Sequence, residues 1–202
     1  MPPCLGHNLF KGIVSFDLAL YINHLVKVDK MFSYLDLNRQ INQFKYLDRD
    51  DKPWEVNPEG GKLGGHAVQN WCLLRMLPVL IGDKVKNPGD NEVWQLVLLL
   101  REVLDLICAP AISNGQIAYL RVLIDEYLHC RIQTFPDNPL KPKHHYVSHY
   151  PELIIQFGPR IRLLTLRFKS KRTYFKQCFR KLRNFKNPCS TLAGRHQLLQ
   201  PF

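Results

Sequence analysis

The run EVWQLVLLLREVLDLIC, residues 92–108, decides the fold class of this 202-residue chain. Nearly every uncharged position in it is apolar, and the turn KNPGD at residues 86–90 places an acid where it could cap a helix. A helix that is buried on most sides accounts for this pattern. Because Arg101, Glu102 and Asp105 interrupt the run, we expect a core helix and no membrane span.

Apolar residues recur at helical spacing on both sides of this run. The predicted helices cover about residues 9–28, 33–44, 66–81, 114–132 and 144–157. Ser33 is suited to cap the second of these helices, and Ser113 or Asn114 the fourth. The chain is therefore predicted to be mainly helical.

Prolines and glycines separate the predicted helices. Residues 48–65 hold two prolines and four glycines without an apolar period, so they are expected to form a loop. Pro78 should kink or end its helix. Three prolines enforce a linker at about 136–142. Residues 161–168 form the only credible strand, and basic and terminal helices are expected at 170–185 and 191–200.

Charge is sharply segregated along the chain. No acid follows Glu152, and the last fifty residues carry twelve Lys and Arg. The preceding 152 residues hold 16 Lys and Arg against 17 Asp and Glu, so the net charge of +11 comes from the carboxyl end. Segregation of this kind points to an anionic partner.

DNA is the partner that this charge favours, because cations interleaved with aromatic residues suit a helix that lies along phosphates. A solvated basic helix is the alternative, and a membrane surface is disfavoured because the pattern directs the aromatic residues toward a core. The predicted DNA-binding residues are Arg160, Arg162, Arg167, Lys171, Arg172, Lys176, Arg180, Lys181, Arg183 and Lys186.

The six cysteines are scattered and indicate reduced, mostly buried thiols. The amino end lacks a basic stretch followed by an apolar one, so no secretory signal is expected. A nuclear or cytoplasmic protein follows from these two observations, and a secreted one does not.

Two short motifs have the spacing of metal ligands. His145 and His149 lie one helical turn apart, and Cys4 and His7 form a Cys-x-x-His pair. Each pair lacks the third ligand of a zinc site, so we expect no metal site. The glycine-rich residues 60–65 lack the Gly-Lys-Ser/Thr ending of a phosphate-binding loop.

Several segments together resemble the C-terminal half of a CACTA (En/Spm-like) DNA transposase from a transposable element. They are residues 4–12 (CLGHNLFKG), 144–152 (HHYVSHYPE), 157–159 (FGP), 166–171 (LRFKSK), 174–176 (YFK), 184–186 (NFK) and 192–197 (LAGRHQ). The resemblance covers nearly the whole chain, but its specific signals lie at the two ends.

The resemblance implies a ribonuclease-H-like core in which two aspartates and a glutamate hold Mg²⁺ for attack on a phosphodiester. It implies that residues 1–8 are a remnant of that core with its Cys-x-x-His motif. Residues 9–157 then match a helical insertion, and residues 158–202 a C-terminal core remnant with one short strand and a basic helix. The strand's partners would be encoded upstream of Met1.

Two departures from the family pattern argue against catalysis. The segment that carries both aspartates is not in the sequence, and Lys169 stands where the related pattern has glutamate. An ammonium group repels Mg²⁺, so Cys4, His7 and Lys169 would be vestigial positions and no cofactor is expected.

The sequence thus predicts a truncated, inactive transposase-derived protein that binds DNA without sequence preference. One alternative is a helical protein-interaction module, without nucleic-acid binding, that pairs with an intact transposase or a host protein. Another is a non-functional transposon fragment.

Overall fold

The structure is a computed structural model that describes residues 4–47, 51–57 and 60–159, together with Ile161, Asn187 and Ser190. The chain divides into two compact units, residues 1–164 and 165–202. The fold described below is that of the first unit. The expected strand, except for Ile161, lies outside the described residues, as do the expected basic and terminal helices.

The first unit is built from helices, and no strand occurs in the part of it that the structure describes. The elements are η1 (Gly6–Ile13), α1 (Val14–Lys27), α2 (Tyr34–Gln43), α3 (Ala67–Ile81), η2 (Gly82–Lys84), α4 (Glu92–Ile107), α5 (Asn114–Thr134), α6 (Pro142–Ser148) and α7 (Tyr150–Phe157). The prediction of a mainly helical protein is confirmed.

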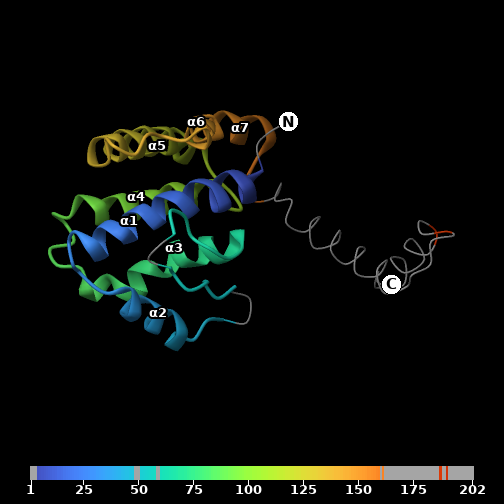
Figure 1. Ribbon diagram of the computed structural model, residues 1–202. Coiled ribbons are helices and arrows are strands. Elements are labelled where there is room, and N and C mark those ends of the chain that lie inside the picture. The colour runs from blue at the N-terminus through green and yellow to red at the C-terminus, as the bar shows by residue number, and fades with distance from the viewer. Residues whose placement is uncertain are drawn as a thin grey trace. The chain divides into compact units, whose positions relative to one another are not determined.

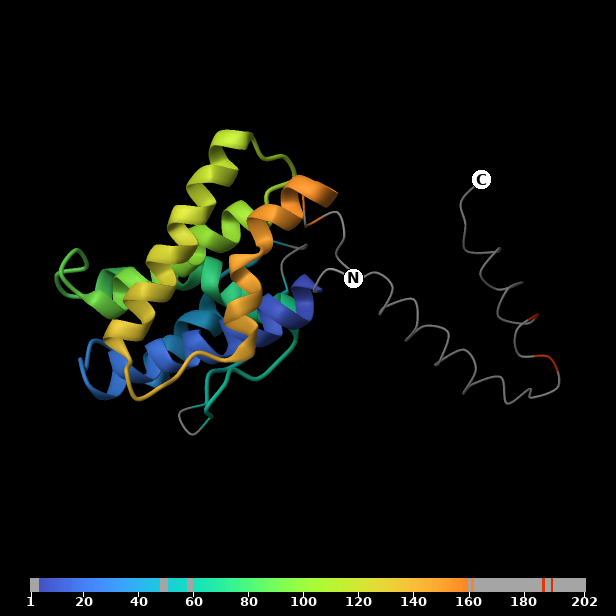
Figure 2. The same ribbon diagram turned by 90° about the horizontal axis from the view of Figure 1, so that it is seen from above.

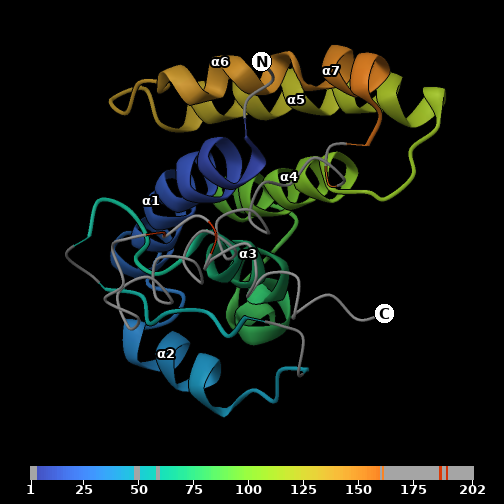
Figure 3. The same ribbon diagram turned by 90° about the vertical axis from the view of Figure 1, so that its right-hand side faces the viewer.

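The helices stack in layers (Figure 1). α1 and α4 form the middle layer, with α5, α6 and α7 on one side of it and α3 and then α2 on the other, an order that Figure 3 also shows. From above, α6 and α7 lie beside α5 (Figure 2), and both contact it. Polar side chains on α1, α5 and α6 can therefore meet inside the protein.

The helix expected at 92–108 is α4, and it is buried as its sequence predicts. Its core side chains are Val93, Trp94, Leu96, Val97, Leu100, Val103, Leu104 and Ile107. Its cap differs from the one expected: the Asn91 side chain accepts a hydrogen bond from the Trp94 N–H at 2.7 Å. Asp90 precedes the Asn91 cap by one residue and stays exposed.

η1 and α1 form one helical segment, and η1 has the wider turns of a π-helix. The carbonyl of Phe10 accepts a hydrogen bond from the buried Asn70 side chain at 3.3 Å, so α3 contacts this wider region directly. Gly6–Lys27 is long and apolar enough to cross a membrane, but 67% of the apolar window is buried within the protein. A core helix passes the same test.

Short polar motifs fix where other helices begin. Ser33 forms a capping box with Asp36 at the start of α2, and Ser113 forms one with Gln116 at the start of α5. Of the two residues that the sequence suggested as the cap of α5, Ser113 and Asn114, the structure uses Ser113. Pro78 does not end α3, which continues to Ile81.

The connection between α2 and α3 is non-helical in its described residues, as expected, but it is anchored to the helices. Asn38 exchanges two hydrogen bonds with the backbone of Val56, at 2.8 and 3.1 Å. Farther along, the Leu63 N–H donates to the Ser15 carbonyl at 2.8 Å. The side chains of Val56 and Leu63 are buried, so this connection forms part of the core boundary.

Pro142 is the first residue of α6, so the expected linker ends as that helix begins. A break at His149 separates α6 from α7, just before Pro151. Gly158, with φ of 74°, follows the end of α7 in a conformation that favours glycine. The expected interruption and stop of this helical region are confirmed.

Candidate functional site

A carboxylate lies buried at the centre of three helices. Asp17, on α1, is 1% exposed and accepts hydrogen bonds through both of its oxygens. Its Oδ1 accepts from Nε of Arg131 on α5 at 3.2 Å, and its Oδ2 from Nε2 of His144 on α6 at 2.7 Å. The Tyr127 hydroxyl, also on α5, donates to Oδ2. One side chain thus joins helices that are more than a hundred residues apart in sequence.

Arg131 extends this contact to the backbone that follows α5. Its Nη1 donates to the Asn138 carbonyl at 2.9 Å and to the Phe135 carbonyl at 3.5 Å. The guanidinium carbon also lies 5.4 Å from the centre of the Phe135 ring. The ion pair with Asp17 therefore fixes the path of the chain from α5 into α6.

His144 has a backbone partner in either protonation state. The Lys141 N–H donates to Nδ1 of the neutral ring at 2.9 Å, which leaves Nε2 to carry the proton that Asp17 accepts. In the imidazolium form, Nδ1–H can donate to the Lys141 carbonyl at 3.2 Å. Backbone groups of Lys141 therefore hold the imidazole ring at the start of α6 in both forms.

Two tyrosines complete the network. The Tyr21 hydroxyl donates to the Tyr127 hydroxyl at 3.1 Å. Burial raises the pKa of both phenols well above the usual value, and the charge of Asp17 raises each further. Both remain neutral hydrogen-bond donors near neutral pH.

Burial by itself would raise the pKa of the Asp17 carboxyl. The hydrogen bond of His144, its charge when protonated, the bond from Tyr127 and the charge of Arg131 outweigh burial, and the pKa is lowered. The groups around Asp17 therefore favour its ionised, carboxylate form.

This lowered pKa predicts a loss of stability in acid. A carboxyl whose pKa falls on folding stabilises the fold above its unfolded pKa of about 4, and that contribution disappears as the pH falls through the folded value. We expect the free energies of unfolding of the wild type and Asp17→Asn to differ by their full amount above about pH 5 and to converge as the pH falls below about 4. Urea titrations across this range test the prediction; a constant difference would contradict it.

The five side chains form a closed structural centre. None of Asp17, Tyr21, Tyr127, Arg131 and His144 is more than 4% exposed. The groups that could transfer a proton are therefore shielded from solvent, and their hydrogen bonds are made within the protein. We interpret this cluster, named the Asp17 network, as a device that fixes helix packing.

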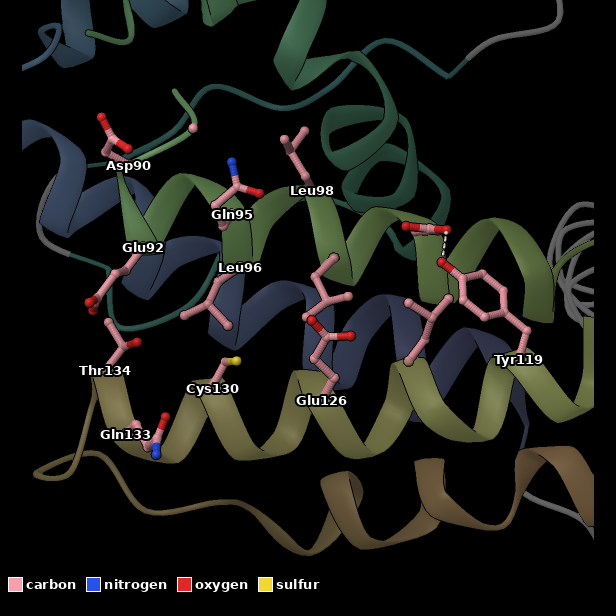
Figure 4. Close-up of a pocket in the computed structure, with 14 residues that line it drawn as sticks. Asp90, Glu92, Gln95, Leu96, Leu98, Tyr119, Glu126, Cys130, Gln133 and Thr134 are labelled. Atoms are coloured by element: carbon pink, nitrogen blue, oxygen red, sulfur yellow. Dashed lines mark hydrogen bonds between the residues drawn. The ribbon is translucent and has the colours of Figure 1, made fainter. Parts of the chain in front are cut away.

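An open groove of about 650 Å³ lies between α4 and α5 (Figure 4). Glu92 and Leu96 point from α4 toward α5, while Glu126 and Cys130 point from α5 toward α4. Leucines and Cys130 supply the apolar part of the lining, which packs on the core. The full lining, named the α4–α5 groove, is Gly89, Asp90, Glu92, Gln95, Leu96, Leu98, Leu99, Glu102, Tyr119, Leu123, Glu126, Cys130, Gln133 and Thr134.

The charge of the α4–α5 groove has one sign. Four of its residues are acidic, and no Lys or Arg occurs among the described residues that line it. At one end Glu102 accepts a hydrogen bond from the Tyr119 hydroxyl at 2.9 Å. That bond raises the pKa of the Tyr119 phenol, and the charges of Glu102 and Glu126 add to the effect. The groove is therefore electronegative above an apolar floor.

The structure adds no third metal ligand to either of the two pairs that have ligand spacing, His145 with His149 and Cys4 with His7, among the described residues. Nε2 of His145 and Nε2 of His149 lie 3.1 Å apart on the surface. Within the described ranges, no group of three or more His, Cys, Asp and Glu could hold a metal ion. Cys4 is partly buried just before the first helix, and His7 is exposed on η1.

The donor set that the transposase resemblance implies does not fit Mg²⁺ in this chain. Lys169 supplies an ammonium group where the pattern requires a carboxylate, and thiol and imidazole groups are poor ligands for this hard cation. Lys169 and all ten predicted DNA-binding residues, Arg160 to Lys186, lie outside the described residues.

The Asp17 network was not identified from the sequence, although one signal was present. Asp17 is the only acid between Leu9 and Leu25, in a stretch that is otherwise mostly apolar. A lone carboxylate on a buried helix requires a partner, because an unpaired buried charge is costly. The identity of that partner needed the tertiary structure.

Comparison of the chain with protein-family models, with characterised proteins and with solved structures finds no match.

Proposed function

We propose that this protein binds DNA without sequence preference through its basic segment, residues 160–186. The observation that carries the proposal is the charge distribution: residues 153–202 hold twelve Lys and Arg and no acid. Contacts between cations and phosphates release counterions and need no particular base sequence. The proposed binding is therefore electrostatic and depends on salt.

The charge of residues 1–159, named the helical unit from here on, supports this assignment of the DNA contact. Residues 1–159 carry one more acid than base, and the α4–α5 groove lined by four acids would repel phosphates. The cations required for DNA binding are concentrated in the basic segment. This concentration favours the segment over the helical surface as the DNA contact.

The ancestry that we propose is a CACTA-type transposase that has lost catalysis. The quoted segments at both ends of the chain support it, with the Cys4-x-x-His7 motif before the helices and LRFKSK at residues 166–171 after them. Residues 158–202 would then be a remnant of a ribonuclease-H-like core, with the helical unit as its insertion. Lys169 in place of glutamate supports the loss of metal-dependent strand cleavage.

DNA binding by the full-length chain is tested with a filter-binding titration against a short duplex at several salt concentrations. If the basic segment contacts about six phosphates, the slope of log affinity against log salt is about −5. Two duplexes of unrelated sequence should bind equally well. No affinity at low salt would overturn the proposal.

A second candidate function is that of a helical protein-interaction module. The observation that favours it is the α4–α5 groove, because an apolar floor bordered by charged residues suits a peptide. The two functions are compatible, since the described residues that line the groove all lie between Gly89 and Thr134, outside the basic segment.

A further inference from the structure

We infer that the α4–α5 groove is a docking site for a cationic amphipathic helix of another protein. The ligand would place Leu-type side chains on the groove floor and Lys or Arg against the acids. The inference does not rest on the proposed DNA binding, because it is argued from described residues of α4, α5 and the turn before α4, and none of these belongs to the basic segment.

The floor of the groove provides apolar surface for such a helix. Leu96 and Leu123 are buried beneath it, while Leu98, Leu99 and Cys130 are only partly buried. The three partly buried residues pack against the core and still face solvent on one side. Apolar side chains of a ligand would cover them, as in other complexes that place a helix in a groove.

Apolar surface also lies beside the groove on α5. Val122 is 61% exposed and follows Tyr119, itself 48% exposed, by three residues. Residues at this spacing lie on the same side of a helix. A ligand helix lying in the groove could therefore also contact the exposed ring of Tyr119 and the side chain of Val122.

The acids are distributed along the groove instead of converging on one point. Asp90 and Glu92 lie near one end with Thr134, Glu126 lies in the middle, and Tyr119 with its bonded Glu102 lies at the other end (Figure 4). The span from residue 119 to residue 134 of α5 is about 22 Å at the helical rise. A ligand helix of about 15 residues matches this span, with a cation near each end and one near its middle.

Charge complementarity selects the cationic ligand. No described Lys or Arg lies within ion-pair distance of Asp90, Glu92 or Glu126, so these carboxylates can pair with a ligand. A divalent cation fits less well, because no group of three His, Cys, Asp or Glu in the described chain could hold one. Nucleic acid would be repelled by the four acids.

The test uses the full-length protein and a fluorescein-labelled 15-residue peptide with leucines on one helical face and lysines flanking them. We expect saturable binding by fluorescence anisotropy. A peptide of the same composition in scrambled order and one with Glu for each Lys should bind at least about tenfold more weakly, because an apolar face and cations are both required. Equal binding of all three peptides would overturn the inference.

Substitutions test whether the peptide binds in the α4–α5 groove. The double variant Glu92→Gln and Glu126→Gln should bind the lysine peptide about fivefold to tenfold more weakly, since each exposed ion pair contributes a modest free energy. Asp51→Asn with Asp83→Asn changes the net charge equally outside the groove and should leave the peptide affinity unchanged. If both double variants weaken binding equally, the effect is one of net charge and the assignment is wrong.

Sedimentation distinguishes a foreign partner from a second copy of the chain as the occupant of the groove. Self-association that is lost in the Glu92→Gln and Glu126→Gln variant would assign the groove to a second copy and overturn the inference.

The same variant should retain DNA affinity, because its substitutions lie outside the basic segment. A failure of peptide binding and a failure of DNA binding are therefore distinguishable.

Discussion

Asp17→Ala is expected to lower the free energy of unfolding by about 3 to 5 kcal/mol. The substitution leaves the guanidinium of Arg131, which is only 4% exposed, without its buried counter-charge. It also removes the acceptor of the His144 and Tyr127 hydrogen bonds. Urea unfolding at pH 7 measures the loss, which is expected to be among the largest for any single substitution in this chain.

The matched control for this prediction is Asp125→Ala. Asp125 is an exposed acid on α5, so its removal should change the free energy of unfolding by no more than about 0.5 kcal/mol. Combining Asp17→Ala with Arg131→Met should cost less than the sum of the two single variants, because the double variant leaves neither charge buried alone. Equal losses for Asp17→Ala and Asp125→Ala would contradict the interpretation of the network.

Neutralising six cations of the basic segment is expected to weaken DNA binding by about 100-fold or more at low salt, because phosphate contacts supply nearly all of a non-specific affinity. The substituted residues are Lys171, Arg172, Lys176, Arg180, Lys181 and Arg183, each replaced by Gln. Filter binding at one low salt concentration measures the change in dissociation constant.

The control for this variant removes the same number of charges from the helical unit. The exposed cations chosen there, each replaced by Gln, are Lys27, Lys30, Arg39, Lys45, Lys62 and Lys86. Because the two variants have the same net charge, any difference between them reports the position of the cations. Circular dichroism and a thermal melt establish that both variants fold.

Helix positions could be predicted from the sequence where local chemistry decides them. Ser33 with Asp36 and Ser113 with Gln116 are capping boxes whose hydrogen bonds are local, so the starts of α2 and α5 follow from a few residues. The start of α4 depended on a finer choice. Asp90 and Asn91 are both residue types that cap helices, and in the structure it is the Asn91 side chain that accepts the hydrogen bond from the Trp94 N–H.

The Asp17 network could not be assembled from the sequence, because its partners are 110 to 127 residues away from Asp17. Helical spacing drew attention to His145 and His149, which face solvent. The neighbouring His144 is the buried one. Which of these imidazoles faces inward depends on how α6 packs against α1 and α5, and local periodicity does not specify that packing.

The α4–α5 groove also depends on tertiary structure. The same α4 helix that buries Leu100 and Leu104 leaves Glu92 and Glu102 exposed, as an amphipathic pattern predicts. That these acids border a groove with Glu126 follows only from the packing of α5 on α4. An acidic site opposite in sign to the basic segment was therefore not foreseen.

The central claim, that DNA contact belongs to the basic segment and not to the helical unit, is tested most directly by the salt dependence of DNA affinity for the two six-fold variants. The slope of log affinity against log salt is expected to be near −5 for the variant neutralised in the helical unit, and clearly shallower for the variant neutralised in the basic segment, which keeps four of the ten predicted DNA-binding cations. Equal slopes for the two variants would contradict it.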